Sequence, residues 1–154
     1  EKLALEGDPK KYPFHSALNS SAEEADFSFS GIKTAVVNLM HNAAQKGETL
    51  SKADIAASFQ RAVCDTLTLK AVHAAKEHGF NTLALAGGVS ANRALRSSLA
   101  RACEEQGIRF CCPDFRYCTD NAAMIACAGH YALMAGELSG LDLNAAPELP
   151  LVQR

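Results

Sequence analysis

The sequence lacks several patterns that would place it in a common class at once. No apolar run is long enough to span a bilayer, so we expect no membrane-spanning helix. The formal net charge is −2, which gives no overall positive field for nucleic acid, and any contact with RNA must come from a local patch. The six cysteines form no CxxC pair, which argues against a zinc site built from them. We therefore expect a reduced, cytoplasmic protein whose thiols are mostly buried.

Signatures with fixed spacing are also missing. Neither an HExxH pair nor the glycine spacing of a GxGxxG or Walker loop occurs, so a self-contained metallopeptidase is not supported. No repeat is visible at periods of about 20 to 50 residues. What is present is a chain of 154 residues, 48% of them hydrophobic. This is enough for one domain with a sizeable core, and too apolar for disorder.

The order of the predicted elements is typical of an α/β protein. Short apolar or alternating runs predict strands, and these are 27–30, 82–86 and 108–112. Amphipathic stretches with start and stop residues predict helices, and these are 32–46, 51–78, 90–107 and 119–138. The unit from 82 to 112 predicts two parallel strands with a right-handed helical crossover. We expect a small sheet packed by helices.

The two ends of the chain lack a regular pattern. Prolines and glycines punctuate the opening residues, and a free-standing domain rarely opens with so long an irregular stretch. The composition predicts an irregular segment over 1–25 that continues from a missing upstream part. It predicts an α/β lobe over 26–139 and a C-terminal tail over 140–154.

A double glycine, Gly87 and Gly88, follows the second predicted strand. Glycines there let backbone N–H groups approach a phosphate or nucleotide, and the following helix N-terminus adds positive partial charge. Ligands of α/β sheets bind beyond the carboxyl ends of the strands. The alternative is an ordinary tight turn with Ser90 as the helix cap. Asn92 could contact a base or a ribose, or it could be a second-choice cap or a solvated residue.

Asp120 opens an almost wholly apolar helix rich in small residues. Such a helix is normally buried between neighbours. The carboxylate could cap the helix and favour its dipole, which is the commoner role. It could instead be a hard oxygen ligand for a metal ion. Arg93 and Arg96, three residues apart on one helix, could form a patch for an anionic ligand or a solvated face.

Three motifs occur in an order and spacing typical of one family. They are DFSFSGIKTAV at 26–36, LAGGVSANRALR at 85–96 and YCTDNAAMIA at 117–126. Together they closely resemble the Gcp/TsaD/YgjD family, the tRNA threonylcarbamoyl-adenosine transferases, formerly called O-sialoglycoprotein endopeptidases or glycoproteases. The resemblance covers nearly the whole chain. It implies the C-terminal lobe of the two-lobed, ribonuclease H-like fold shared by actin, Hsp70 nucleotide-binding domains and sugar kinases.

The resemblance also implies an activity and its residues. Such enzymes move a threonylcarbamoyl group from its adenylate onto an anticodon-adjacent adenosine of tRNA, with the help of a metal and of partner proteins in a modification complex. The family's iron or zinc is held by an HxxxH pair in the N-terminal lobe and by the Asp of the CTDN motif, which matches Asp120. The glycines and the Asn of GGVSAN, which contact substrate or nucleotide, match Gly87, Gly88 and Asn92. No residue here is assigned a catalytic role.

The chain also departs from the family, because it contains no HxxxH pair. We therefore expect a fragment that is inactive alone and binds no iron or zinc at Asp120. We expect Gly87, Gly88, Asn92 and Asp120 to meet on one cleft face, which is exposed or is covered by a second copy in a homodimer. Two other functions stay open. They are a metal-dependent glycoprotease and a non-catalytic nucleotide-binding or partner-docking domain.

Overall fold

The computed structural model describes residues 1–14 and 26–146. The remainder of the predicted irregular opening, 15–25, and the end of the predicted tail, 147–154, lie outside the described residues.

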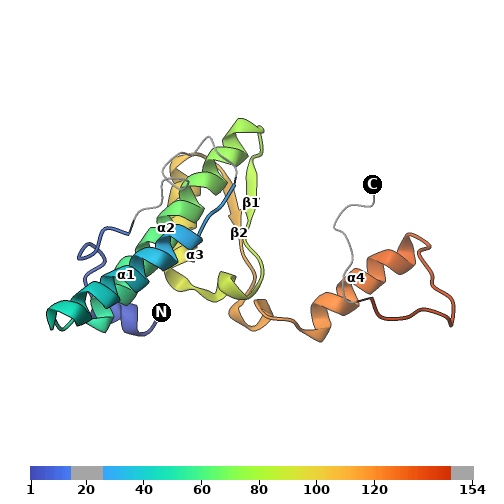
Figure 1. Ribbon diagram of the computed structural model, residues 1–154. Helices are drawn as coiled ribbons and strands as arrows, with labels where there is room; N and C mark the ends of the chain where they lie inside the picture. The colour runs from blue at the N-terminus through green and yellow to red at the C-terminus, as the bar shows by residue number, and fades with distance from the viewer. Residues whose placement is uncertain (15–25, 147–154) are drawn as a thin grey trace. The chain divides into compact units, whose positions relative to one another are not determined.

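The chain forms two compact units, Glu1–Thr119 and Asp120–Arg154. Figure 1 shows the elements of each unit in order along the chain. The predicted three-part division of the chain into an opening segment, a lobe and a tail stays a prediction.

The first unit is mostly helical around a small sheet. Its described elements are η1 (Leu3–Glu6), α1 (Ser30–Lys46), α2 (Lys52–Glu77), β1 (Thr82–Ala84), η3 (Gly88–Ala91), α3 (Arg93–Glu105), β2 (Arg109–Cys111) and η4 (Phe115–Tyr117). The long helix α2 lies at the centre, and η1, α1, α3 and β1 all contact it (Figure 1). The prediction of an α/β protein with a small sheet packed by helices is confirmed.

The sheet joins β1 and β2 in parallel, with Thr82 opposite Arg109 and Ala84 opposite Cys111. Helix α3 connects the two strands, as the strand–helix–strand pattern predicted. A parallel pair places the carboxyl ends of both strands at the same edge. The Gly87–Gly88 turn and the loop after β2 therefore leave the sheet on the same side.

The predicted strand at 27–30 is wrong. Residues 26–29 belong to no element, and α1 begins at Ser30. The rings of Phe27 and Phe29 stack on each other with their centroids 6.2 Å apart. The Lys70 ammonium of α2 donates a hydrogen bond of 2.5 Å to the carbonyl oxygen of Asp26. The alternation of Phe and Ser imitates a strand, but the segment is bound to a helix and pairs with no strand of the described residues.

The helix boundaries follow the stop and start residues that the sequence offers. Helix α1 ends at Gly47, whose φ of 69° is the left-handed conformation that glycine adopts readily. Helix α2 begins after Ser51, whose hydroxyl oxygen accepts a hydrogen bond of 3.2 Å from the Asp54 N–H. Both boundaries were predicted.

The core lies between α2, α3 and the sheet. Its side chains come from all these elements, and the most deeply buried are Leu95, Leu99 and Cys103 of α3. Val72 of α2 and Ile108, just before β2, pack with Cys103. Packing on both neighbours fixes α3 and the turn that leads into it.

The opening residues pack on the first turns of α2. The Asp54 carboxylate accepts a hydrogen bond of 2.8 Å from the Asp8 N–H. The Ser58 hydroxyl donates to the Asp8 carbonyl oxygen and accepts from the Tyr12 N–H, both at 3.1 Å. Between these contacts and η1 lies Gly7, where the chain passes directly against the backbone of Ala53.

Replacing Gly7 by alanine is expected to detach this opening segment. A Cβ atom at Gly7 would lie 2.1 Å from the carbonyl oxygen of Ala53, which is rigid helix backbone. We expect a loss of about 1–3 kcal/mol in the free energy of unfolding, measured by urea titration. Gly129→Ala is the matched control, because a Cβ there meets no atom within 4 Å. Equal stability of the two variants would contradict the close packing.

The second unit, Asp120–Arg154, contains one described helix. Its only described helix, α4 (Ala122–Met134), is shorter than the predicted 119–138 and has no buried residue. Within this unit the prediction of a buried helix is not met. The physical reason is that the described part of this unit contains no second helix or strand to cover α4. Among the described residues, no helix combines the length and apolar character needed to cross a membrane.

Candidate functional site

The turn after β1 has a backbone that only glycine adopts readily. Gly87 has φ 85° and ψ 174°, a region that side chains exclude. The chain then forms the short helix η3, in which the Ser90 N–H donates to the Gly87 carbonyl oxygen at 3.0 Å. A Cβ atom built at Gly87 or at Gly88 would meet no atom within 4 Å. The glycines therefore border open space in the first unit.

Asn92, and not Ser90, caps α3. The Asn92 Oδ1 accepts a hydrogen bond of 2.9 Å from the Leu95 N–H. Ser90 is fully buried, and its hydroxyl finds no hydrogen-bond partner among the described residues. The alternative of Ser90 as cap is wrong, because η3 moves the helix start two residues further along the chain. The cap alternative for Asn92 is confirmed.

The capping bond uses only part of the hydrogen-bonding capacity of the Asn92 amide. Its Nδ2 donates one hydrogen bond of 3.2 Å to the Gln60 Oε1 of α2. A primary amide has two N–H groups, and its oxygen has two lone pairs. One N–H and one lone pair remain, so Asn92 can cap α3 and still contact a ligand. The sequence does not reveal that Gln60 holds this amide in place, because the two residues are 32 positions apart and no motif links them.

Arg96 forms neither an anion patch nor a solvated face. Its side chain is half-buried and crosses from the glycine turn to the loop after β2. The Nε–H donates to the Ser90 carbonyl oxygen, and Nη2 donates to the Pro113 carbonyl oxygen at 2.6 Å. The guanidinium also stacks on Phe115, 4.1 Å from the ring centroid. Both alternatives offered for Arg96 are therefore wrong, because tertiary contacts occupy its donors.

Asp120 is not the cap of α4. That role belongs to Asn121, whose Oδ1 accepts a hydrogen bond of 3.0 Å from the Met124 N–H. The Asp120 side chain is exposed, one residue too early to cap. The capping interpretation of Asp120 is wrong by one position. Because Asp120 and Asn92 belong to different units, their convergence on one face stays a prediction.

The described residues do not build a metal site by themselves. Among them, no group of three His, Cys, Asp or Glu side chains lies close enough to hold an ion. Iron and zinc sites in proteins need several ligands held in one geometry. Asp120 could supply one oxygen ligand, so the donor set of this chain alone does not fit the family's metal.

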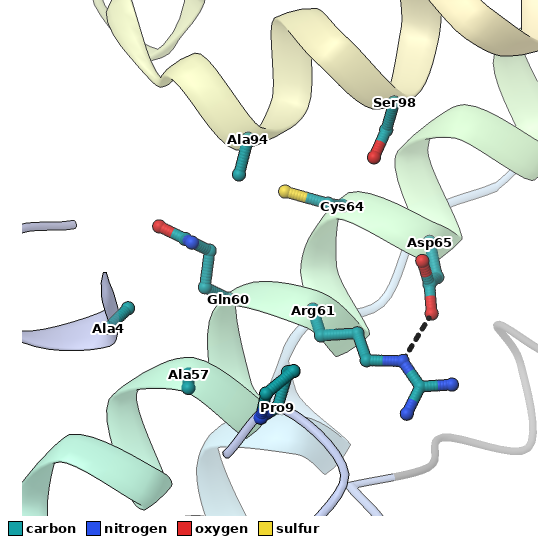
Figure 2. Close-up of a pocket in the computed structure, with 9 residues that line it drawn as sticks. All are labelled: Ala4, Pro9, Ala57, Gln60, Arg61, Cys64, Asp65, Ala94 and Ser98. Atoms are coloured by element: carbon teal, nitrogen blue, oxygen red, sulfur yellow. Dashed lines mark hydrogen bonds and ion pairs between the residues drawn. The ribbon is translucent and has the colours of Figure 1, made fainter. Parts of the chain in front are cut away.

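A pocket of about 220 Å³ lies between the opening segment, α2 and α3 (Figure 2). The Cys64 thiol points toward α3 in this view, and Arg61 forms an ion pair of 3.3 Å with Asp65 at the rim. A second pocket, of about 300 Å³, is lined by Asn92, and it shares Gln60 and Cys64 with the first.

All six cysteines are free thiols. Cys64, Cys103 and Cys118 are buried, Cys111 is half-buried, and Cys112 and Cys127 are exposed. The prediction that most thiols are buried therefore holds for half of them.

Stability is expected to fall above pH 9 because of Cys64. Burial raises the pKa of its thiol from the ordinary 9.0 to about 11, with smaller contributions from the Asp65 and Glu1 carboxylates. Between these values the unfolded thiol releases its proton while the folded thiol keeps it. The stabilisation is therefore complete below pH 9.0 and is lost toward pH 11, at about 1.4 kcal/mol per pH unit.

Urea unfolding between pH 8 and pH 11 checks this prediction. Cys64→Ala is the control, since other groups also titrate in this range and only the difference between the two curves reports on Cys64. The variant should show a flatter dependence on pH. Parallel curves would contradict the shifted pKa.

The fold is that of an α/β protein with a glycine turn that borders open space at the carboxyl end of a parallel strand. The family model of the tRNA N6-adenosine threonylcarbamoyltransferases, TsaD, matches residues 1–127. The chain belongs to this family, which confirms the resemblance seen in its motifs.

Three similar proteins are all named tRNA N6-adenosine threonylcarbamoyltransferase. The whole chain is 46% identical to the tRNA N6-adenosine threonylcarbamoyltransferase of Caldicellulosiruptor saccharolyticus and covers 45% of it. It is 46% identical over 151 residues to that of Moorella thermoacetica, where 98% of the chain covers 44% of the relative. It is 42% identical over 154 residues to that of Clostridium botulinum. The chain thus spans less than half the length of these relatives.

Proposed function

We propose that this chain is the C-terminal part of a tRNA N6-adenosine threonylcarbamoyltransferase. It would act on threonylcarbamoyl-adenylate and on an anticodon-adjacent adenosine of tRNA. The observation that carries the proposal is the Gly87–Asn92 turn, which borders open space at the N-terminus of α3 within the matched residues. The parallel β1–β2 pair joined by α3 supports one lobe of an actin-like fold.

The glycine turn would hold the nucleotide end of the donor. Gly87 and Gly88 present no side chain, so backbone groups can approach a phosphate closely. The N-terminus of α3, a helix of 13 residues, contributes a positive partial charge there. The remaining N–H and lone pair of Asn92 would contact the ribose or the base.

The same groups would stabilise the leaving group. In the transfer, the N6 amine of adenosine attacks the carbonyl carbon of the threonylcarbamoyl group. The bond from that carbon to the phosphate oxygen breaks, and the nucleotide leaves as a monophosphate while the amine loses a proton. Negative charge therefore grows on the phosphate, where helix-end and backbone dipoles stabilise it without reorganisation.

Asp120 would be one ligand of an iron or zinc ion whose other ligands lie outside this chain. Its exposed carboxylate, free of the capping role, supports this assignment. Partner proteins of the modification complex would cover exposed surface, and α4 has exposed apolar side chains that a partner or a second copy could cover. They include Met124, Ile125, Tyr131, Leu133 and Met134.

The test uses a protein made by joining this chain to the part of the Caldicellulosiruptor saccharolyticus relative that it does not match, called the joined protein below. Unmodified tRNA, threonylcarbamoyl-adenylate, iron or zinc and the partner proteins of the relative are supplied, and the tRNA is digested to nucleosides for mass spectrometry. We expect threonylcarbamoyl-adenosine from the joined protein and none from the 154-residue chain alone. The intact relative is the positive control.

The alternatives give different results in the same series. Cleavage of a sialoglycoprotein without tRNA modification would support the glycoprotease. Binding of the adenylate without transfer, beside an active relative, would support a non-catalytic nucleotide-binding domain. Either result would contradict the proposed function.

A further inference from the structure

We infer that Arg96 is a positioning residue, which fixes the Gly87–Asn92 turn against the loop 113–118 that follows β2. Its effect on catalysis rests on the proposed function, whereas its hold on the turn rests on geometry alone. The two segments leave the carboxyl ends of the two parallel strands. The Arg96 side chain is bound to both of them.

The bonds of Arg96 go to backbone on both sides. Its Nε–H donates to the carbonyl oxygen of Ser90, inside η3. Its Nη2 donates to the carbonyl oxygen of Pro113 at 2.6 Å and to the Cys118 Sγ at 3.1 Å. Because the donors of a guanidinium lie in one rigid plane, these bonds set the distance and the angle between the two segments.

The ring of Phe115 holds the guanidinium plane in place. The Arg96 guanidinium carbon lies 4.1 Å from the ring centroid, within the range of a cation–π contact. The Arg93 guanidinium lies on the same ring at 5.6 Å. A ring packed under the cation restricts its rotation, so the hydrogen bonds keep a single geometry.

At its end the turn has one side-chain anchor of its own, Asn92, which donates to Gln60 and caps α3. The middle of the turn has none among the described residues. Ser90 is fully buried, yet its hydroxyl has no hydrogen-bond partner among the described residues. Gly87 and Gly88 carry no side chain. Arg96 therefore holds the middle of the turn at the Ser90 carbonyl group, and the position of Gly87 and Gly88 depends on it.

The experiment compares Arg96→Lys with Arg101→Lys in the 154-residue chain. Lysine keeps the charge but cannot reach both carbonyl groups with a planar fork. Arg101 lies on the same helix and is exposed, so it is the matched control. Hydrogen exchange is followed by mass spectrometry. We expect the amides of 87–92 to exchange at least roughly tenfold faster in Arg96→Lys only, with α2 unchanged.

Kinetics of the joined protein give the second readout. A displaced turn should raise the KM for threonylcarbamoyl-adenylate roughly tenfold, with a smaller change in kcat and none in the KM for tRNA. If the amides of 87–92 exchange at the same rate in Arg96→Lys as in Arg101→Lys, the inference is overturned. Faster exchange spread evenly over α2 and α3 would also overturn it, since that would show a merely structural role.

The two experiments distinguish failure of the proposed function from failure of the inference about Arg96. If the wild-type joined protein transfers nothing while the intact relative is active, the proposed function fails. The exchange rates of 87–92 still decide whether Arg96 holds the turn.

Discussion

Asp120→Ala in the joined protein is expected to lower the rate of tRNA modification by about 100-fold or more and to leave α4 intact. Loss of a group that merely supports a metal ligand costs about 10- to 100-fold, and loss of a ligand itself should cost at least as much. The helix should persist because Asn121, and not Asp120, caps it. The rate of nucleoside formation and the helical content by circular dichroism measure the two effects.

Asn121→Ala is the matched neighbour. It removes the hydrogen bond to the Met124 N–H and should destabilise α4 by about 1 kcal/mol. It should retain far more activity than Asp120→Ala. Equal loss of activity in the two variants would show that Asp120 acts only through the start of the helix.

Metal content adds an independent readout. The 154-residue chain alone is expected to bind no stoichiometric iron or zinc, since one carboxylate binds a divalent ion weakly against water. A stoichiometric metal in the chain that disappears in Asp120→Ala would contradict this expectation. It would mean that the chain builds a complete site.

Gly88→Ala is expected to weaken adenylate binding by about 10- to 100-fold without loss of stability. A Cβ at Gly88 meets no protein atom within 4 Å, and its φ is not positive, so the folded chain accepts the methyl group. If the donor occupies that space, the methyl group must displace it, at a cost of about 1–3 kcal/mol. Equilibrium binding of the adenylate to the joined protein and urea unfolding of the chain measure the two quantities.

Comparison of Gly87→Ala with Gly88→Ala distinguishes the effect of filling the open space from the effect of backbone strain. Gly87→Ala too would place a Cβ in open space, but at φ 85°, where alanine is strained by about 1–3 kcal/mol. This variant should therefore lose stability as well as binding. Unchanged binding in Gly88→Ala would show that no ligand approaches the glycines.

The sequence was sufficient for the features that depend on local chemistry. Gly47 and Ser51 mark the end of α1 and the start of α2 because a left-handed glycine and a hydroxyl cap act within one turn of helix. The parallel pairing of β1 and β2 was predicted because a helix lies between them, and parallel neighbours need such a crossover connection. The three motifs predicted the family, which the matched residues confirm.

Two caps were misplaced by one or two residues. In Ser90-Ala-Asn92 and in Asp120-Asn121, both polar residues are good caps, and propensity alone does not separate them. A short 3-10 helix decided the first case in favour of Asn92. The second was decided by the backbone of Asn121, which is extended at φ −151° and ψ 154° directly before the helix.

Contacts between distant segments could not be predicted. Gln60 holds Asn92, and Arg96 holds the turn, through bonds that depend on how α2, α3 and the loop after β2 pack. The prediction of a strand at 27–30 was wrong for a related reason. The alternation of Phe and Ser there fits a strand, but Lys70 binds the start of the segment to a helix.

Photo-crosslinking of the joined protein with an azido analogue of the adenylate, followed by trypsin digestion and mass spectrometry, tests directly whether the nucleotide binds at Gly87–Asn92. Cleavage after Lys76 and Arg93 releases the glycine turn in one peptide, 77–93. We expect this peptide to carry the label, and we expect the label to disappear with excess unlabelled adenylate and in the Gly88→Ala variant. Labelling confined to other peptides, or labelling of 77–93 that Gly88→Ala leaves unchanged, would contradict a nucleotide site at Gly87–Asn92.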